Sequence, residues 1–207
     1  MSGIFITFEG PDASGKTTQI RLLREYLEEK GIPYLITREP GGTAISEKIR
    51  NLILDKAHSE MCPVTEALLY AASRAQLVRE VIQPALQEGK VVISDRYVDS
   101  SIAYQGYGRG LGDMVRAINE PATGGLRPDA TFLLKTDPAS MRSRRSAEEE
   151  DRMDAQKLEF HREVLRGYLA LAEEEPERIR VIDGEQDIEE IAGEIRNCMD
   201  LLIGSRC

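Results

Sequence analysis

Short apolar runs alternate with longer stretches of helical periodicity along most of the chain. The runs at residues 3–8, 34–37, 91–94, 131–135 and 179–183 have the length and composition of buried strands. Alternating strands and helices are typical of a parallel sheet that helices cover on both faces through right-handed crossovers. The pattern therefore predicts an α/β fold of three layers around a five-stranded parallel sheet.

Helical periodicity is clearest in three stretches. Residues 16–30 place isoleucine and leucine on roughly one face, and Gly31 supplies a C-terminal stop. A longer helix starts near residue 65, where we expect Pro84 to bend it and Gly89 to end it. Apolar residues from about 188 to 202 predict a further helix near the C-terminus.

Residues 142–152 break this pattern, because arginine and acidic residues leave almost no apolar position there. Such a segment adds little to a core, so it is either a solvated loop or a short mobile lid. The chain shows no internal repeat and no low-complexity linker. We therefore expect residues 1–207 to form a single domain, with the lid at about 142–152.

The segment from Gly10 to Thr17, GPDASGKT, matches the pattern G-x-x-x-x-G-K-S/T between the first predicted strand and the first predicted helix. A glycine-rich turn in that place directs backbone N–H groups into one concavity, and the helix N-terminus adds partial positive charge. Lys16 can then reach the β- and γ-phosphates of a nucleotide, and the hydroxyl of Thr17 can bind Mg²⁺. This context favours a phosphate site over a turn that only connects two elements.

Charged pairs follow the next two strands, Arg38-Glu39 after the second and Asp95-Arg96 after the third. Ligands of open α/β sheets bind outside the carboxyl ends of the strands, so these pairs and the P-loop are expected at one rim. The guanidinium groups suit a second phosphoryl group in line with the γ-phosphate, and Asp95 can hold the metal, often through water. Ion pairs without a catalytic role remain the alternative for both segments.

Composition narrows the class of protein. Charged residues make up 30% and apolar residues 41% of the chain, and the net charge of −9 argues against general binding of nucleic acid. No apolar run approaches the roughly 20 residues of a membrane span, and the first residues lack a signal-peptide pattern. We therefore expect a cytoplasmic protein that binds neither nucleic acid nor a membrane.

Four motifs follow one another along the chain, within a resemblance that covers nearly all of it: residues 8–18 around the P-loop, REPGGT at 38–43, LYAASR at 69–74 and DRYVDSSIAYQG at 95–106. In that order and spacing they resemble bacterial thymidylate kinases, which are P-loop nucleoside monophosphate kinases. The resemblance implies transfer of the γ-phosphoryl group of ATP to dTMP at a Mg²⁺-containing site. The products are dTDP and ADP, in the biosynthesis of dTTP.

Other functions are less favoured. A kinase for another nucleoside monophosphate is the nearest alternative, and a nucleotide-dependent switch is a more distant one. No Asn-Lys-x-Asp segment for reading guanine occurs in the sequence, which argues against a GTPase. The resemblance also implies a homodimer formed through helices. A helix face with Leu68, Leu69, Leu77 and Val81 suits such an interface and equally suits an ordinary core.

The resemblance assigns residues to the acceptor. Arg74 matches an arginine at the carbonyl edge of thymine, and Tyr70, one helical turn earlier, matches an aromatic residue that stacks on the base. Ser101 and Gln105 match residues at the base edge and share one face if their segment is helical, while Tyr104 matches a tyrosine beside the sugar. The implied dTMP-binding set is Asp12, Arg38, Glu39, Arg50, Tyr70, Arg74, Arg96, Ser101, Tyr104 and Gln105. Core packing remains the alternative for the tyrosines, and a solvated helix face remains the alternative for Arg74 and Arg50.

The resemblance assigns the donor side as well. The implied ATP-binding set is Gly10, Pro11, Asp12, Ala13, Ser14, Gly15, Lys16, Thr17 and Thr18 with Arg142 and Arg145, and the metal residues are Thr17 and Asp95. Some family members carry an arginine directly after the acidic P-loop residue, where this chain has Ala13. The chain resembles the other subtype, in which lid arginines supply that charge to the ATP phosphates. The implied catalytic residues are Asp12, Lys16, Arg38, Glu39, Arg96, Arg144 and Arg152, and the choice among the lid arginines stays open.

Overall fold

Parallel strands form one five-stranded sheet in the order β2-β3-β1-β4-β5. The structure is a computed structural model, and it describes residues 3–141, 152–153 and 156–205. The strands are β1 (Ile4–Glu9), β2 (Tyr34–Arg38), β3 (Val91–Asp95), β4 (Ala130–Lys135) and β5 (Ile179–Asp183). This confirms the predicted sheet, with small shifts at the strand ends.

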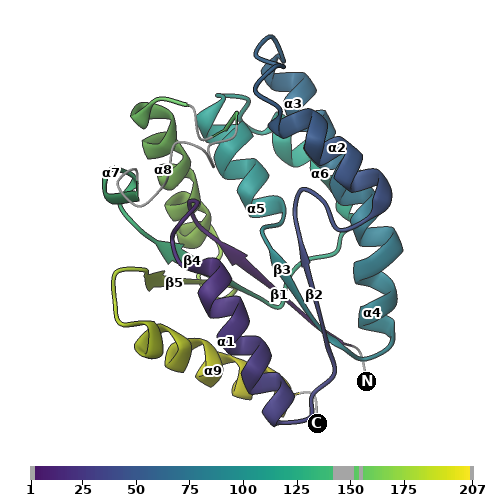
Figure 1. Cartoon of the computed structure of the whole chain (residues 1–207), viewed down its shortest axis with the longest axis vertical. Helices are drawn as coiled ribbons and strands as arrows, with labels where there is room; N and C mark the ends of the chain where they lie inside the picture. The colour runs from purple at the N-terminus through teal and green to yellow at the C-terminus, as the bar shows by residue number, and fades with distance from the viewer. Residues whose placement is uncertain (1–2, 142–151, 154–155, 206–207) are drawn as a thin grey trace.

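Helices cover both faces of the sheet (Figure 1). One face carries α1 (Lys16–Glu29) and α9 (Ile188–Gly204), which pack against each other. The other face carries α3 (Pro63–Leu77), the π-helical η2 (Ile102–Gly108) and α8 (Leu158–Glu174). The remaining described helices are α2 (Ala44–Leu54), η1 (Val78–Ile82), α4 (Gln83–Gln87), α5 (Val98–Ser101), α6 (Met114–Thr123) and α7 (Pro138–Met141).

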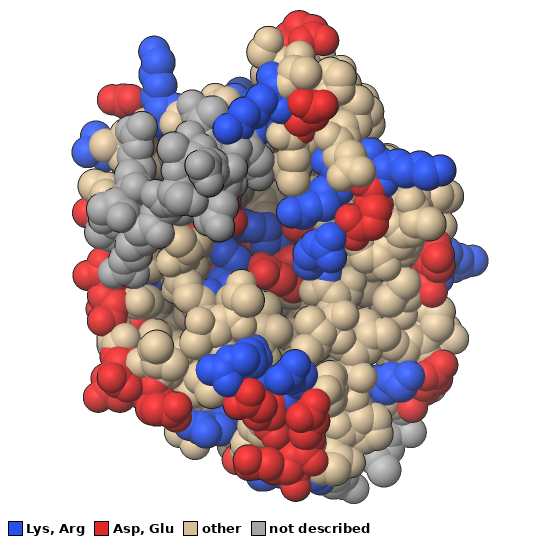
Figure 2. Space-filling view, in the orientation of Figure 1, with Lys and Arg blue, Asp and Glu red and all other residues tan. Residues whose placement is uncertain are grey.

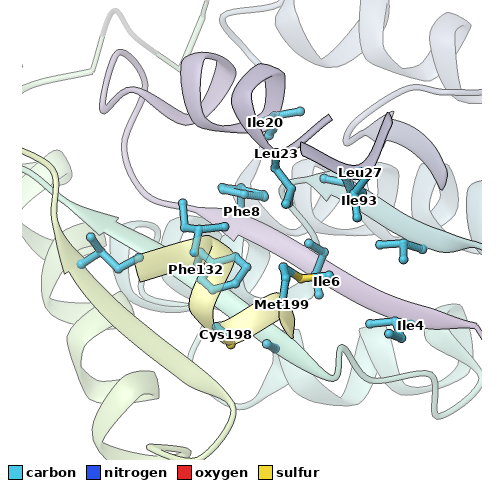
Figure 3. Packing of buried hydrophobic residues seen from close by; sticks show 14 of the residues in the cluster. Ile4, Ile6, Phe8, Ile20, Leu23, Leu27, Ile93, Phe132, Cys198 and Met199 are labelled. Atoms are coloured by element: carbon cyan, nitrogen blue, oxygen red, sulfur yellow. The ribbon is translucent and has the colours of Figure 1, made fainter. Parts of the chain in front are cut away.

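The central strand β1 supplies side chains to both layers of the core. Side chains alternate across a strand, so Ile4, Ile6 and Phe8 pack toward α1 and α9 (Figure 3). Phe5 points to the opposite face and packs with Leu77 of α3 and its neighbours. This double burial explains why β1 reads as an uninterrupted apolar run rather than an alternating one.

The long helix predicted from about residue 65 begins at Pro63 and consists of α3, η1 and α4 in succession. Pro84 has no N–H to donate to the carbonyl of Glu80, and its ring clashes with the preceding turn of a regular helix. The chain widens into π-type hydrogen bonds directly before the proline, and the N–H of Gln83 donates to the carbonyl of Val78. The predicted disturbance at Pro84 thus takes the form of a π-helical turn.

The strand register gathers the charged strand ends at one rim. Phe8 of β1 and Arg38 of β2 both lie opposite Asp95 of β3. The residues that follow these positions include the P-loop, Glu39 and Arg96, which therefore emerge side by side. No helix within the described ranges is long and apolar enough to cross a membrane.

Phe132 of β4 offers a test of the core. Its side chain is fully buried, and its ring centroid lies 5.3 Å from that of Phe8. Replacing Phe132 by alanine should lower the free energy of unfolding by roughly 3–5 kcal/mol, because the substitution leaves a cavity. Urea denaturation followed by circular dichroism measures this change. Val181→Ala, at an exposed position of β5, should change the same quantity by less than about 0.5 kcal/mol. Equal losses in both variants would contradict this account of the core.

Candidate active site

The P-loop is a tight turn that depends on glycine at two positions. Gly10 has a φ of 129°, and a Cβ there would lie 2.5 Å from the carbonyl oxygen of Leu134. Gly15 caps α1 with a φ of 97°. A side chain would strain either position. The first turn of α1 contains no acidic residue, so the positive end of the helix dipole is available to an anion.

Lys16 is buried in the first turn of α1. Its Nζ donates to the carbonyl oxygens of Gly10 and Pro11, at 3.1 and 2.8 Å. Burial and the nearby charge of Arg96 lower the pKa of Lys16 to about 8, against the opposing charge of Asp12. The two carbonyl oxygens stabilise the buried ammonium group only in part. A negatively charged ligand would stabilise it further.

A cavity, here named the P-loop cavity, opens in front of this turn, and its empty volume of about 900 Å³ includes space open to solvent. Figure 2 shows basic and acidic side chains clustered around a hollow near the middle of this face. The residues that line it are Asp12, Ala13, Gly15, Lys16, Thr17 and Thr18 with Arg38, Glu39, Arg50, Asp95 and Arg96. The structure thus brings most of the predicted ATP-binding set together, while Gly10, Pro11 and Ser14 are buried within the turn.

Arg96 follows β3 in a left-handed backbone conformation with a φ of 71°, which is uncommon for a residue with a side chain. Its N–H donates to the carbonyl of Phe8 at 2.9 Å, and its carbonyl accepts from the hydroxyl of Ser94 at 2.7 Å. The N–H of Tyr97 donates to Oε1 of Glu9 at 2.7 Å. The surrounding structure therefore fixes this strained turn.

The turn directs the guanidinium of Arg96 toward the P-loop. Its Nη2 lies 2.7 Å from Oδ1 of Asp12, and its Nη1 donates to the hydroxyls of Ser100 and Tyr168 at 3.1 and 3.0 Å. The same group stands 5.2 Å from the ring centroid of Tyr104. These contacts hold a permanent positive charge at one place on the rim.

Glu9 is fully buried, and the hydroxyls of Ser100 and Tyr168 connect it to Arg96. Its Oε2 accepts from the hydroxyls of Ser100 and Tyr168, at 2.5 and 3.1 Å. Burial, followed by the charge of Asp99, raises the pKa of Glu9 to about 7, although hydrogen bonds and Arg96 oppose the shift. Sequence reasoning missed both Glu9 and Tyr168. A carboxyl at the end of an apolar strand was a usable signal for Glu9, whereas Tyr168 lies on α8, which the periodicity did not reveal.

A second cavity lies between α3 and η2, and its empty volume of about 530 Å³ includes space open to solvent; we keep the name second cavity for it. Its lining comprises every predicted acceptor residue except Arg38, together with Pro40, Leu54, Ser100 and Met153. Ser101 and Gln105 both belong to it, so the shared face expected of them is present. Arg50, for which a solvated face was the alternative, also lines both cavities.

Arg74 is buried rather than solvated, with 1% of its surface exposed. Its Nη2 lies 2.5 Å from Oε2 of Glu39 and donates to the carbonyl of Tyr97 at 3.0 Å. Its Nη1 donates to the hydroxyl of Ser101 at 3.1 Å and to Oδ1 of Asn119. Burial raises the pKa of Glu39 to about 6, although Arg74 opposes the shift. Arg74 therefore forms a buried ion pair with Glu39 and also lines the second cavity.

Of the two cavities, Arg38 lines only the P-loop cavity, and its side chain is weakly held. Its Nη2 lies 2.9 Å from Oε1 of Glu47, with both side chains substantially exposed. Arg50 instead donates through Nη1 to the carbonyl of Pro40 at 2.8 Å. Both guanidinium groups can therefore turn toward a bound phosphate without breaking a buried ion pair.

The lid arginines divide into two groups. Arg142, Arg144 and Arg145 lie outside the described residues. Arg152 was expected within a solvated stretch that contributes almost no core, and that expectation is wrong at this position. Its side chain is buried, Nε donates to the carbonyl of Ile53 at 2.7 Å, and Nη2 lies 2.6 Å from Oε2 of Glu66. Partners supplied by α2 and α3 make its burial favourable.

The oxygen atoms at the rim fit a divalent cation. Oδ1 of Asp95 is buried and has no hydrogen-bond partner among the described residues. Thr17 lines the P-loop cavity together with Asp95. No group of three or more His, Cys, Asp or Glu in the described residues is arranged to hold a metal. Mg²⁺ suits such a place, because it is commonly bound by one or two carboxylates together with substrate phosphates.

The fold and the rim together define a P-loop phosphotransferase, in which one phosphate-binding cavity adjoins a second cavity lined by arginines. A family model described as thymidylate kinase matches residues 8–195. The chain is 50% identical to a thymidylate kinase of Symbiobacterium thermophilum over 98% of this chain and 95% of that protein. It is 53% identical to a thymidylate kinase of Lactobacillus delbrueckii, over 92% of each chain.

A solved structure agrees with these matches. The crystal structure of thymidylate kinase from Ehrlichia chaffeensis superposes with a TM-score of 0.78 at 35% identity, covering 97% of this chain and 99% of that one. The chain belongs to the thymidylate kinase family. The P-loop fold and the dTMP kinase class predicted from the sequence are thereby confirmed.

Glu9 should make the stability of the protein depend on pH. Its pKa is about 7 in the folded chain and 4.5 ordinarily, so the folded state binds this proton more tightly. Its contribution to stability is therefore fully present below about pH 4.5 and is lost as the pH rises through about 7. Glu9→Gln mimics the neutral acid and should lack this loss. The melting temperature of the variant minus that of the wild type should thus increase between pH 5 and 8. A difference that stays constant over this range would contradict the raised pKa.

Proposed function

We propose that this chain transfers the γ-phosphoryl group of ATP to dTMP, giving dTDP and ADP, where the P-loop cavity and the second cavity meet. One observation carries the proposal: the two cavities share Asp12, Glu39, Arg50 and Arg96. Two nucleotides bound in cavities with a common border present their phosphates to each other directly. Transfer then needs no covalent intermediate on the protein.

The P-loop cavity binds ATP. Backbone N–H groups of the P-loop and the start of α1 contact the phosphates, and Lys16 exchanges its contacts with Gly10 and Pro11 for phosphate oxygens. Thr17 and Asp95 hold Mg²⁺, which neutralises charge on the phosphates when it is bound. The lid at about 142–152 closes the single domain over ATP, and Arg142, Arg144 and Arg145 supply the charge that Ala13 lacks, since Arg152 is buried against Glu66.

The second cavity binds dTMP. Nε of Arg74 and Oε1 of Gln105 are both buried and have no hydrogen-bond partner among the described residues. One is a donor and the other an acceptor. Thymine presents the complementary pair, a carbonyl oxygen next to an N–H. Tyr70 and Tyr104 also line the cavity, with Tyr70 stacking on the base and Tyr104 lying against the sugar.

The reaction proceeds by in-line displacement. A phosphate oxygen of dTMP, already anionic, forms a bond to the γ-phosphorus, while the bond from that phosphorus to the leaving ADP oxygen breaks. No strong general base is required, so catalysis rests on alignment and charge neutralisation. Arg96, Arg50 and Arg38 hold the acceptor phosphate and the transferring group. The carboxylate of Asp12, 2.7 Å from Arg96, orients that guanidinium before the substrate arrives.

The active species is a cytoplasmic homodimer. Leu68 and Val64 of α3 are exposed at 52% and 36%, and Ile45 and Leu52 of α2 are exposed as well. These apolar side chains on neighbouring helices support an interface there. Leu77, considered for the interface from the sequence, is fully buried in the core and is not available to a partner.

Acceptor specificity tests the function. ADP release, measured with ATP and each of dTMP, dUMP, dCMP, UMP and AMP, should give the highest kcat/KM with dTMP. The value for dUMP should fall about 10- to 200-fold, because one methyl contact is lost. Activity confined to AMP would contradict the assignment. Turnover that no acceptor stimulates would indicate a switch instead of a kinase.

Asp95→Asn tests the metal site. The amide keeps the shape of the side chain but removes the charge that attracts the cation, so half-maximal activity should need about tenfold more Mg²⁺. A Mg²⁺ titration of the initial rate at saturating dTMP measures this shift. Asp113→Asn, at an exposed carboxylate before α6, is the matched control and should leave the titration unchanged. Identical titrations for both variants would place the metal elsewhere.

A further inference from the structure

A buried carboxylate that no part of the reaction described above uses lies directly behind Gln105. Glu66 of α3 has no exposed surface, and it is not part of the lining of the second cavity. Its Oε1 accepts from Nε2 of Gln105 at 2.9 Å and from Nε of Arg109 at 3.2 Å. Its Oε2 accepts from Arg109 at 3.0 Å and from Arg152 at 2.6 Å.

The two arginines keep Glu66 ionised. Burial alone raises the pKa of Glu66, but hydrogen bonds from Arg109, Gln105 and Arg152 outweigh burial, and the net shift is downward. Arg109 is itself fixed, since Nη1 donates to Oε1 of Gln156 at 2.8 Å and the guanidinium stands 4.7 Å from the ring centroid of Phe160. An ionised carboxylate in this setting can only accept hydrogen bonds.

This restriction determines the orientation of the Gln105 amide. The nitrogen must face Glu66, because the amide oxygen is also an acceptor and would be repelled by the negatively charged carboxylate. The oxygen of Gln105 is therefore turned away from Glu66, and it is buried with no partner among the described residues. A buried acceptor without a donor is costly, and a ligand that brings an N–H removes that cost.

We propose that Glu66 is a positioning residue for the acceptor base, which fixes the amide of Gln105 so that its oxygen receives an N–H from the base. This inference rests on the proposed binding of dTMP in the second cavity. Thymine and uracil both carry a ring N–H beside a carbonyl. Cytosine has a lone pair at that ring position and would face the oxygen of Gln105 with repulsion. Glu66 thus contributes to base selection without touching the base.

Glu66→Gln tests the inference, because a neutral amide accepts and donates and so lets the Gln105 amide rotate. We expect the KM for dTMP to rise about tenfold and the KM for ATP to stay within about twofold. The dUMP reaction should lose as much as the dTMP reaction, since both bases share the same edge. The ratio of kcat/KM for dTMP to that for dCMP should fall about tenfold, because the rotated amide accommodates cytosine.

A double-mutant cycle with Gln105→Ala separates positioning from general damage. In the Gln105→Ala background, adding Glu66→Gln should leave the KM for dTMP unchanged, because the group that Glu66 positions is gone. Glu175→Gln is the matched control: this carboxylate also pairs with an arginine, Arg178 at 2.8 Å, away from both cavities. It should alter neither KM nor the dTMP-to-dCMP ratio.

The inference is overturned if Glu66→Gln lowers kcat/KM for dTMP and dCMP equally, or if its effect is the same with and without Gln105. Where Glu66→Gln fails to fold by circular dichroism, Glu66→Asp replaces it in both measurements. Aspartate keeps the negative charge beside Arg109 and Arg152, but its shorter side chain draws the carboxylate away from Nε2 of Gln105. A wild-type protein without dTMP-dependent ADP release would refute the proposed function. An active wild type with additive effects in the cycle would refute only the role of Glu66.

Discussion

A carboxyl group with no exposed surface at the end of the central strand holds the site together. Glu9 accepts hydrogen bonds from the backbone after β3, from α5 and from α8. A buried polar group of this kind is expensive unless it is paired, so these elements cannot separate without exposing or orphaning it. The left-handed turn at Arg96 rests on this arrangement, and the guanidinium that meets Asp12 is placed by that turn. The positions of Arg96 and Asp12 at the shared border of the cavities therefore depend on the buried side chain of Glu9.

The arginines around the cavities differ in how firmly their carboxylate partners hold them. The exposed pair Arg38–Glu47 is worth only about 0–1 kcal/mol, so Arg38 is readily released to an anion. Removing one partner from the buried pair Arg74–Glu39 costs about 3–5 kcal/mol, so Arg74 remains in place and offers only its unpaired Nε. Arg96 lies between these extremes, with 14% of its side chain exposed. The three arginines thus differ with their exposure. Arg38 can move toward an anion, Arg74 is a fixed part of the cavity wall, and Arg96 is a positive charge held in place by Asp12.

Sequence patterns predicted the parts of the molecule that local chemistry determines. The P-loop, the strands and the charged strand ends are encoded within a few residues of each other, and all lie where the pattern indicated. The catalytic and binding roles of these residues stay predictions. The contacts that were missed join distant segments: Tyr168 meets Glu9 across 159 positions, and Arg152 meets Glu66 across 86. The charged neighbours of Arg152 are typical of a solvated segment. No local pattern indicates that the carboxylate of Glu66, on α3, is its buried partner.

The common border of the two cavities also has a consequence for ligand design. Asp12, Glu39, Arg50 and Arg96 belong to both linings, so the two cavities adjoin each other at these side chains. On the proposed assignment of dTMP to the second cavity and ATP to the P-loop cavity, a single molecule that joins thymidine to adenosine through a phosphate chain would reach into both. Linking the two halves makes the second contact intramolecular, and the gain in affinity reaches about 10²–10⁴-fold when the chain length matches the span. Such a chimeric inhibitor would exclude both substrates through one binding event.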